Sequence, residues 1–127
     1  MKENSDKRIL IVTDDALLGF GMSRMLEKYM PLVRLADNWG EALSDMACSL
    51  CPLCFLDLDM SGADGLEVVQ KMREASPGTR IVAMTAFPIA DEMKRKLEDC
   101  AYMLLNKPFD PIQLKLIAKQ VLETATA

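Results

Sequence analysis

The segment FLDLDMSGADG, residues 55–65, runs from apolar residues directly into two aspartates, Asp57 and Asp59, and then into a loop that contains glycine. A carboxylate at the end of a buried strand costs on the order of several kcal/mol to desolvate unless a positive charge lies against it. The segment therefore predicts a strand that ends at a functional site, and residues elsewhere in the chain are expected to neutralise these acids.

Short apolar runs alternate with segments of helical periodicity along the chain. The predicted strands are residues 8–13, 32–36, 53–58, 80–85 and 101–105. The predicted helices are residues 16–29, 39–47, 65–75, 90–99 and 111–123, with Asn38 and Asp110 as N-caps of the second and the last. Five strand–helix repeats predict an α/β fold, a doubly wound five-stranded parallel sheet flanked by five helices.

Composition limits the classes of function. The 127 residues, 50% hydrophobic and 27% charged, predict one compact domain, 1–127, with a core over about 7–122. A net charge of −4 argues against nucleic-acid binding by this chain. Neither a signal peptide nor an apolar run of the roughly 20 residues that a membrane span needs is found, which predicts a cytoplasmic location without membrane partners. The chain contains no histidine, so a phosphohistidine donor would have to be on another molecule.

Three cysteines, Cys48, Cys51 and Cys54, lie in the segment CSLCPLC and imitate the spacing of an iron–sulfur protein. No fourth ligand is nearby, and Cys54 enters a predicted buried strand. We therefore interpret these residues as free thiols that pack as small hydrophobic side chains in a reducing compartment.

Polar residues follow four of the predicted strands. In parallel α/β sheets, ligands bind outside the carboxyl ends of the strands, so these residues are expected to share one rim. They are Asp14, Asp15, Asp57, Asp59, Thr85 and Lys107. Carboxylates without histidine or thiolate suit Mg²⁺, and a carboxylate can attack phosphorus to form an acyl phosphate. Each residue alone also has a plainer interpretation: helix N-caps for the first two, strand packing for the threonine, and a solvated surface lysine.

The chain resembles the receiver domain of two-component response regulators, in the manner of the single-domain chemotaxis type, over essentially all of residues 7–122. The matching segments are ILIVTDD, NWGEAL, CFLDLDMSGADGLEVVQKMRE, IVAMTAF and NKPF. The resemblance implies a flavodoxin-like fold and a phosphorylation-activated signalling switch rather than an enzyme with turnover. It further implies a sensor histidine kinase or phosphotransfer protein as donor, and a downstream protein or a removed effector domain as the output partner.

The resemblance also implies the roles of individual residues. Asp57 would be the phosphoacceptor. Mg²⁺ would be held by the acidic pair Asp14 and Asp15, by Asp57 and by the backbone carbonyl of Asp59. Thr85 would be the switch hydroxyl, and the phosphoryl group would also be stabilised by the lysine that precedes an expected cis proline bond, Lys107–Pro108. The face formed by the fourth helix and the fifth strand would bind the partner, and a homodimer through the fourth helix, fifth strand and fifth helix is left open.

Two positions depart from the pattern of the family. The fifth strand carries Leu104 where relatives place an aromatic ring that rotates inward on phosphorylation, so the usual switch is in question. Tyr102, two residues earlier, would point to the same face of that strand. Cys100 stands where relatives usually have glycine, and a positive φ angle there would strain it.

Asp59 and Phe87 would flank the path of a hydrolytic water and set the lifetime of the phosphoryl group.

Two other functions are open from sequence. The first is a receiver-like interaction module with degenerate switching, which Leu104 motivates. The second is an aspartate-nucleophile phosphatase of the haloacid dehalogenase type, because LDLDMS imitates the D-x-D motif of that family. That motif belongs on the first strand of such enzymes and here falls on the third, so the phosphatase ranks last.

Overall fold

Five strands and five helices alternate along the chain in the computed structural model, which describes residues 7–30, 32–48, 50–60, 62 and 64–126, without the side chains of residues 48 and 124–126. Pro31, the predicted end of the first helical segment, lies outside the described residues. The elements are β1 (Lys7–Val12), α1 (Ala16–Leu26), β2 (Val33–Ala36), α2 (Trp39–Cys48), β3 (Leu50–Asp57), α3 (Gly65–Ala75), β4 (Arg80–Thr85), α4 (Asp91–Cys100), β5 (Met103–Asn106) and α5 (Pro111–Thr126).

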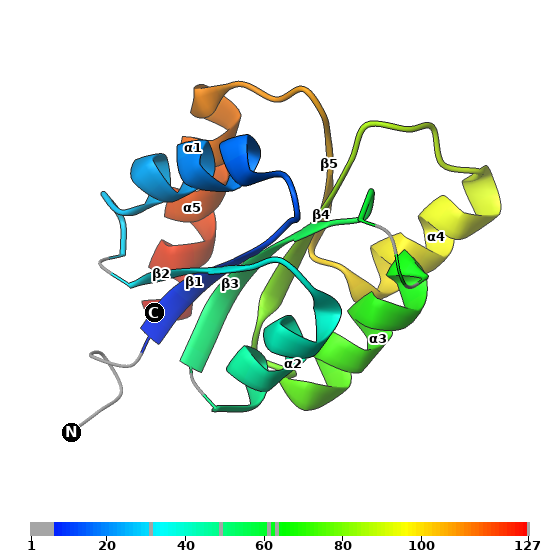
Figure 1. Ribbon diagram of the computed structural model, residues 1–127, viewed down its shortest axis with the longest axis horizontal. Coiled ribbons are helices and arrows are strands. Elements are labelled where there is room, and N and C mark those ends of the chain that lie inside the picture. The colour runs from blue at the N-terminus through cyan, green and yellow to red at the C-terminus, as the bar shows by residue number, and fades with distance from the viewer. Residues whose placement is uncertain (1–6, 31, 49, 61, 63, 127) are drawn as a thin grey trace.

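The strands form one parallel sheet in the order β2-β1-β3-β4-β5. Because all strands run in the same direction, their carboxyl ends meet at one edge. Helices α1 and α5 cover one face of the sheet, and α2, α3 and α4 cover the other (Figure 1). The predicted fold class is confirmed.

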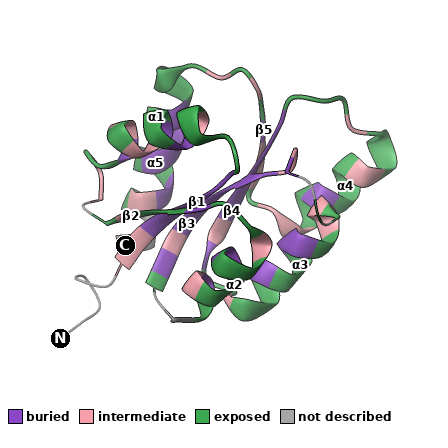
Figure 2. Cartoon of the chain, in the orientation of Figure 1, coloured by how far each residue is buried: buried purple, intermediate pink, exposed green. Residues whose placement is uncertain are grey.

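Alternate residues of each central strand serve two separate cores. In β1, Ile9 and Ile11 pack toward α1 and α5, whereas Leu10 and Val12 pack toward α2 and α3. The same alternation holds in β3, where Phe55 faces the first pair of helices. Burial on both faces explains why the strands are almost continuously apolar in sequence, and Figure 2 shows the central strands largely buried while the outer sides of the helices are exposed.

Most predicted boundaries lie within two or three residues of the observed ones. Both predicted N-caps are confirmed: Asn38 Oδ1 accepts from Glu41 N at 2.8 Å, and Asp110 Oδ1 accepts from Gln113 N at 2.9 Å. The predicted start of β3 was three residues late. The strand begins at Leu50 because a register irregularity beside β1 accommodates an extra residue, which lets the strand continue through a proline.

The cysteine residues are structural where they are described. Cys51 and Cys54 are buried free thiols, and burial raises the pKa of Cys51 to about 11 and the pKa of Cys54 well above its ordinary value. Cys48 lies in α2, but its side chain is outside the described part of the chain. The expectation of backbone strain at Cys100 was wrong, since this residue ends α4 and no described residue other than glycine has a positive φ angle.

None of the helices within the described residues has both the length and the apolar character that a membrane crossing requires.

Candidate functional site

Asp57 is the last residue of β3, the central strand of the sheet, and its residue surface is 2% exposed. The strand holds it firmly, since Asp57 pairs with Met84 of β4 and the next residue, Leu58, donates its N–H to the Met84 carbonyl at 2.8 Å. A carboxylate in this position is cut off from bulk water and depends on neighbouring donors and charges.

Lys107 supplies the opposing charge from the loop that follows β5. Its Nζ lies 2.8 Å from Asp57 Oδ1 and 3.1 Å from Asp59 Oδ2, and its side chain is only 18% exposed. The Lys107 N–H donates to the Thr85 carbonyl at 2.9 Å, and the expected cis Lys107–Pro108 bond is present. Burial alone would lower the pKa of Lys107, but the hydrogen bonds and charges of the two aspartates outweigh it and raise this pKa above its usual range.

Thr13 is a site residue that sequence reasoning missed. Its hydroxyl donates to Asp57 Oδ2 at 2.7 Å and accepts from the Asp15 N–H at 3.1 Å. A hydroxyl residue directly before the acidic pair, at the end of the strand next to β3, was the available signal. Its role at the site follows only from the structure, which places β1 next to β3.

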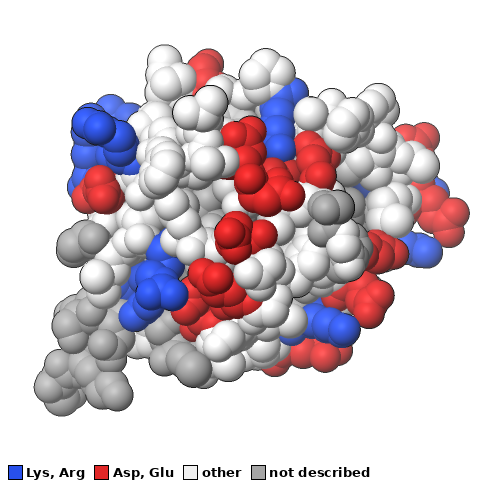
Figure 3. All heavy atoms as spheres, viewed as in Figure 1, with Lys and Arg blue, Asp and Glu red and all other residues white. Residues whose placement is uncertain are grey.

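The acidic pair lies beside this contact, at the start of α1. Asp15 is the N-cap of the helix, because its Oδ1 accepts from Leu18 N at 3.1 Å. The interpretation of this residue as a helix N-cap is therefore confirmed. Asp14 and Asp15 are both exposed and line a hollow of about 240 Å³ together with Asp37 and Glu41. Figure 3 shows acidic side chains gathered over the middle of the face that the strand ends present.

The acidic residues of this rim can supply part of the coordination shell of a metal ion. Among the described residues, no three acidic or thiol side chains come close enough together to bind one ion. An ion of the Mg²⁺ type does not require three such side chains, because it keeps several waters and also binds backbone oxygens. The remaining features fit such an ion, since no described basic residue forms an ion pair with Asp14 or Asp15, and the Thr13 hydroxyl, which donates to Asp57, also accepts from the backbone N–H of Asp15.

The side chain of Asp59 is engaged by three donors on the side of β4 and β5. Oδ1 accepts from the Thr85 hydroxyl at 2.8 Å, and Oδ2 accepts from the Ala86 N–H at 2.8 Å and from Lys107 Nζ at 3.1 Å. Burial alone would raise the pKa of Asp59, but the hydrogen bonds from Ala86, Thr85 and Lys107 outweigh it and hold this pKa below its usual range. The Ala86 N–H was not anticipated from sequence.

Leu104 packs against the core under α4 and lines a cavity of about 530 Å³ beside Thr85. Tyr102 lies one residue before β5, where its N–H donates to the Ile81 carbonyl at 2.8 Å, and it lines the same cavity as Leu104. The Tyr102 ring lies under the guanidinium of Arg80, 5.5 Å from the ring centroid.

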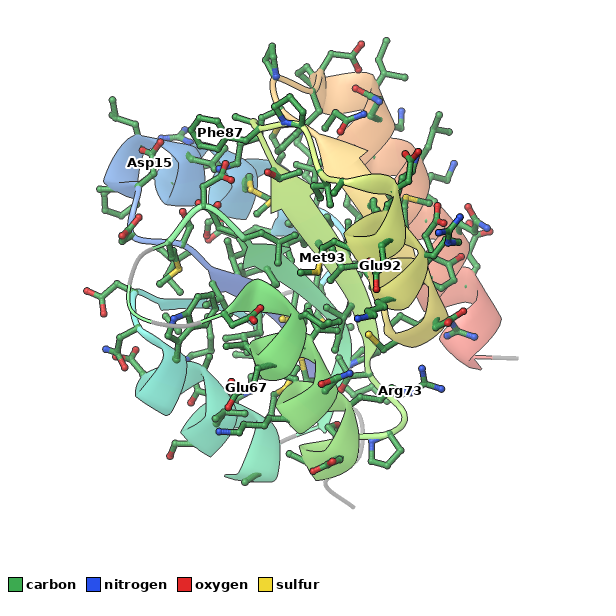
Figure 4. All side chains as sticks on the ribbon, turned by 90° about the vertical axis from the view of Figure 1, so that its right-hand side faces the viewer. Asp15, Glu67, Arg73, Phe87, Glu92 and Met93 are labelled. Atoms are coloured by element: carbon green, nitrogen blue, oxygen red, sulfur yellow. The ribbon has the colours of Figure 1, made fainter. Side chains whose placement is uncertain are left out.

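Phe87 lies in the loop between β4 and α4, and the residue is largely solvent-exposed, at 68%. Its N–H donates to the Thr85 hydroxyl at 3.1 Å, which ties the loop to the end of β4. Figure 4 shows Phe87 at the same end of the molecule as Asp15. The loop therefore borders the site.

The arrangement around Asp57 can support nucleophilic chemistry on phosphorus. Oδ1 accepts two hydrogen bonds, from Lys107 and from the Asp59 N–H at 2.8 Å, while Oδ2 accepts one, from Thr13. A carboxylate offers about four lone-pair positions, so one on Oδ2 is free of these contacts. An ammonium, a hydroxyl and a backbone N–H lie close by, and donors of this kind stabilise the oxygens of a transferring phosphoryl group.

Comparison with known proteins is consistent with this geometry. The sequence profile of the response regulator receiver domain matches residues 9–119. The alginate biosynthesis transcriptional regulatory protein AlgB of Pseudomonas aeruginosa is 33% identical over 125 residues, which are 97% of this chain and 28% of that protein. This chain thus spans about a quarter of the length of the AlgB relatives that it matches.

Shorter relatives and solved structures match over nearly their full lengths. Sporulation initiation phosphotransferase F of Bacillus subtilis is 26% identical, with 92% of this chain and 94% of that protein covered. The crystal structure of a CheY-like response regulator receiver domain protein from Methanospirillum hungatei JF-1 is 26% identical, with a TM-score of 0.84 and coverage of 94% and 96%. With a family profile that spans most of its length, the chain belongs to the response regulator receiver domain family.

Proposed function

We propose that Asp57 accepts a phosphoryl group from the phosphohistidine of a sensor histidine kinase or a phosphotransfer protein. An oxygen of the Asp57 carboxylate forms a bond to phosphorus while the bond between phosphorus and the imidazole nitrogen breaks, and the imidazole keeps the electron pair and takes up a proton. The observation that carries the proposal is the buried carboxylate of Asp57 at the end of β3 with the Lys107 ammonium 2.8 Å away. A phosphorylation switch is the general role of the family.

Mg²⁺ is the proposed cofactor, held by Asp14, Asp15, Asp57 and the backbone carbonyl of Asp59. When bound, it would neutralise charge on the transferring oxygens. The chain's own residues orient and neutralise: Lys107 holds Asp57 in place, and the Thr85 hydroxyl and Ala86 N–H, which in this structure bind the Asp59 carboxylate, are proposed as donors to the phosphoryl oxygens. The Thr85 hydroxyl is proposed as the group that follows the phosphoryl group and passes its arrival to the loop after β4.

The partner-binding face is proposed to be α4, β5 and α5. Residues 1–127 would act as one receiver domain, and the output partner would be either a separate protein or an effector domain of the same protein. A homodimer through this face is a further proposal. It draws support from a solved structure, a dimer of the beryllofluoride-activated NtrC4 receiver domain, which is 25% identical to this chain with a TM-score of 0.82.

One observation favours a second candidate, an interaction module that binds its partner without switching. Leu104 has no ring to rotate, and the cavity beside Thr85 is open around it. Partner affinity that is equal with and without beryllofluoride would support this candidate over the first. The phosphatase alternative is no longer proposed, because membership in the receiver family accounts for the D-x-D motif on β3.

The phosphoacceptor is tested with acetyl phosphate and Mg²⁺. The wild-type chain should gain the mass of one phosphoryl group, and Asp57→Asn should gain none, because the amide is a poor nucleophile. Intact-mass spectrometry measures both. Asp64→Asn is the matched control, since it removes the same charge at a nearby N-cap and asparagine caps equally well. Equal labelling of Asp57→Asn and wild type would contradict the proposal.

The metal ligands are tested by calorimetric titration with Mg²⁺. Asp15→Asn should weaken the Mg²⁺ affinity by about tenfold or more, because a carboxylate ligand is lost while the helix cap is retained. Asp37→Asn is the control, as this acid lines the same hollow but is not a proposed ligand. The same affinity in both variants would show that the acidic pair acts only through its general negative charge.

The lifetime of the phosphoryl group is proposed to depend on Phe87 and Asp59. Phe87→Ala should speed hydrolysis by about twofold or more, because a smaller side chain at the rim admits water more readily. The loss of the phosphoryl mass after removal of acetyl phosphate gives the rate. Ile112→Ala, which truncates a comparably exposed residue on α5, should leave the rate unchanged. Unchanged rates in both Phe87→Ala and Asp59→Asn would refute this role.

A further inference from the structure

The carboxylate of Asp59 occupies a complete set of anion-binding donors. A hydroxyl, a backbone N–H and an ammonium converge on its two oxygens at 2.8, 2.8 and 3.1 Å, from Thr85, Ala86 and Lys107. The three donors come from the ends of β4 and β5, and Asp59 reaches them from the loop after β3. The side chain is only 15% exposed, and its contacts with Thr85 and Lys107 are part-buried, whereas its contact with the Ala86 N–H is exposed.

One of these donors also serves the proposed phosphoacceptor. Lys107 Nζ contacts Asp57 and Asp59 at once, at 2.8 and 3.1 Å. A phosphoryl group on Asp57 would bring three acceptor oxygens and a charge near −2 into this space. It would need the same donors that Asp59 already uses, and two anions so close together repel each other.

We propose that the Asp59 carboxylate is an internal substitute for the phosphoryl group, which holds Thr85, Ala86 and Lys107 in an anion-bound arrangement before phosphorylation. Phosphorylation must then displace the side chain of Asp59 from these donors. The inference rests on the proposed role of Asp57, and it gives Asp59 a function beyond a backbone ligand or a modulator of lifetime.

Two features of the surrounding structure agree with this proposal. The single O–H donor of Thr85 is already used, because it donates to Asp59, and the hydroxyl oxygen also accepts from the Phe87 N–H at 3.1 Å. Leu104 lines the cavity beside Thr85 and carries no aromatic ring that could couple to a movement of this hydroxyl. The loop after β4 is therefore held at Thr85 even without a phosphoryl group. The unphosphorylated and phosphorylated forms of this chain are expected to differ less than those of a relative with a neutral residue at the position of Asp59.

The first test compares beryllofluoride binding in Mg²⁺ by calorimetry, since this anion stands in for the phosphoryl group on Asp57. Asp59→Asn should bind beryllofluoride about tenfold tighter than wild type or more, because the competing charge is gone while the shape of the side chain is kept. Asp64→Asn removes a charge nearby without touching the three donors and should match the wild type within about twofold. Equal or weaker binding by Asp59→Asn would overturn the proposal.

The second test needs neither metal nor beryllofluoride. In metal-free buffer, Asp59→Ala should move the amide proton signal of Ala86 upfield in nuclear magnetic resonance spectra, because its hydrogen bond to a carboxylate is lost, while Asp64→Asn should leave it in place. An unmoved Ala86 signal in Asp59→Ala would overturn the proposal. Absence of beryllofluoride binding in every form, with the Ala86 signal shifted as expected, would instead overturn the role of Asp57 and reduce the Asp59 contacts to an ion pair only.

Discussion

The ion pair between Asp57 and Lys107 is the interaction on which the rest of the site depends. Asp57 is almost fully buried at the end of the central strand, where an unpaired carboxylate would be strongly destabilising. The ammonium that compensates it comes from the other end of the chain, 50 residues later, and is 2.8 Å away. The ion pair therefore holds the loop after β5 against the end of β3, next to the donors at the end of β4.

The order of the strands explains why this convergence is possible. β3 lies between β1 and β4, and the chain reverses its direction of winding between β1 and β3. Acids that follow β1 and the acid that ends β3 therefore share an edge, at the position where open α/β sheets bind ligands. The Thr13 hydroxyl bridges the two strands, and Lys107 closes the site from the side of β5. The result is an anionic centre that the Lys107 ammonium neutralises in part, with the exposed acidic pair Asp14 and Asp15 beside it.

Sequence reasoning reached the fold and the principal residues because both leave local signals. Apolar runs and helical periodicity predicted all ten elements, and the strand ends named Asp57, Thr85 and Lys107 as neighbours. It could not find the role of Thr13 or the Ala86 N–H, because these contacts depend on which strands are adjacent and on the path of a loop backbone. The side chain of Asp59 was anticipated as an influence on the site, but the three donors that hold it come from elements about 26 to 48 residues away in sequence. β5 begins at Met103, two residues later than predicted, so Tyr102 precedes the strand.

The most direct measurement of the central claim is a double-mutant cycle on the unfolding free energy, with Asp57→Asn, Lys107→Met and the double variant in metal-free buffer. If the buried pair organises the site, the two substitutions should couple by about 1.5–3 kcal/mol, well above the roughly 0.3–0.5 kcal/mol expected for an exposed pair such as Glu67 and Lys71 on α3. Single effects that add to within about 0.3 kcal/mol would contradict the account, because Asp57 and Lys107 would then not stabilise one another.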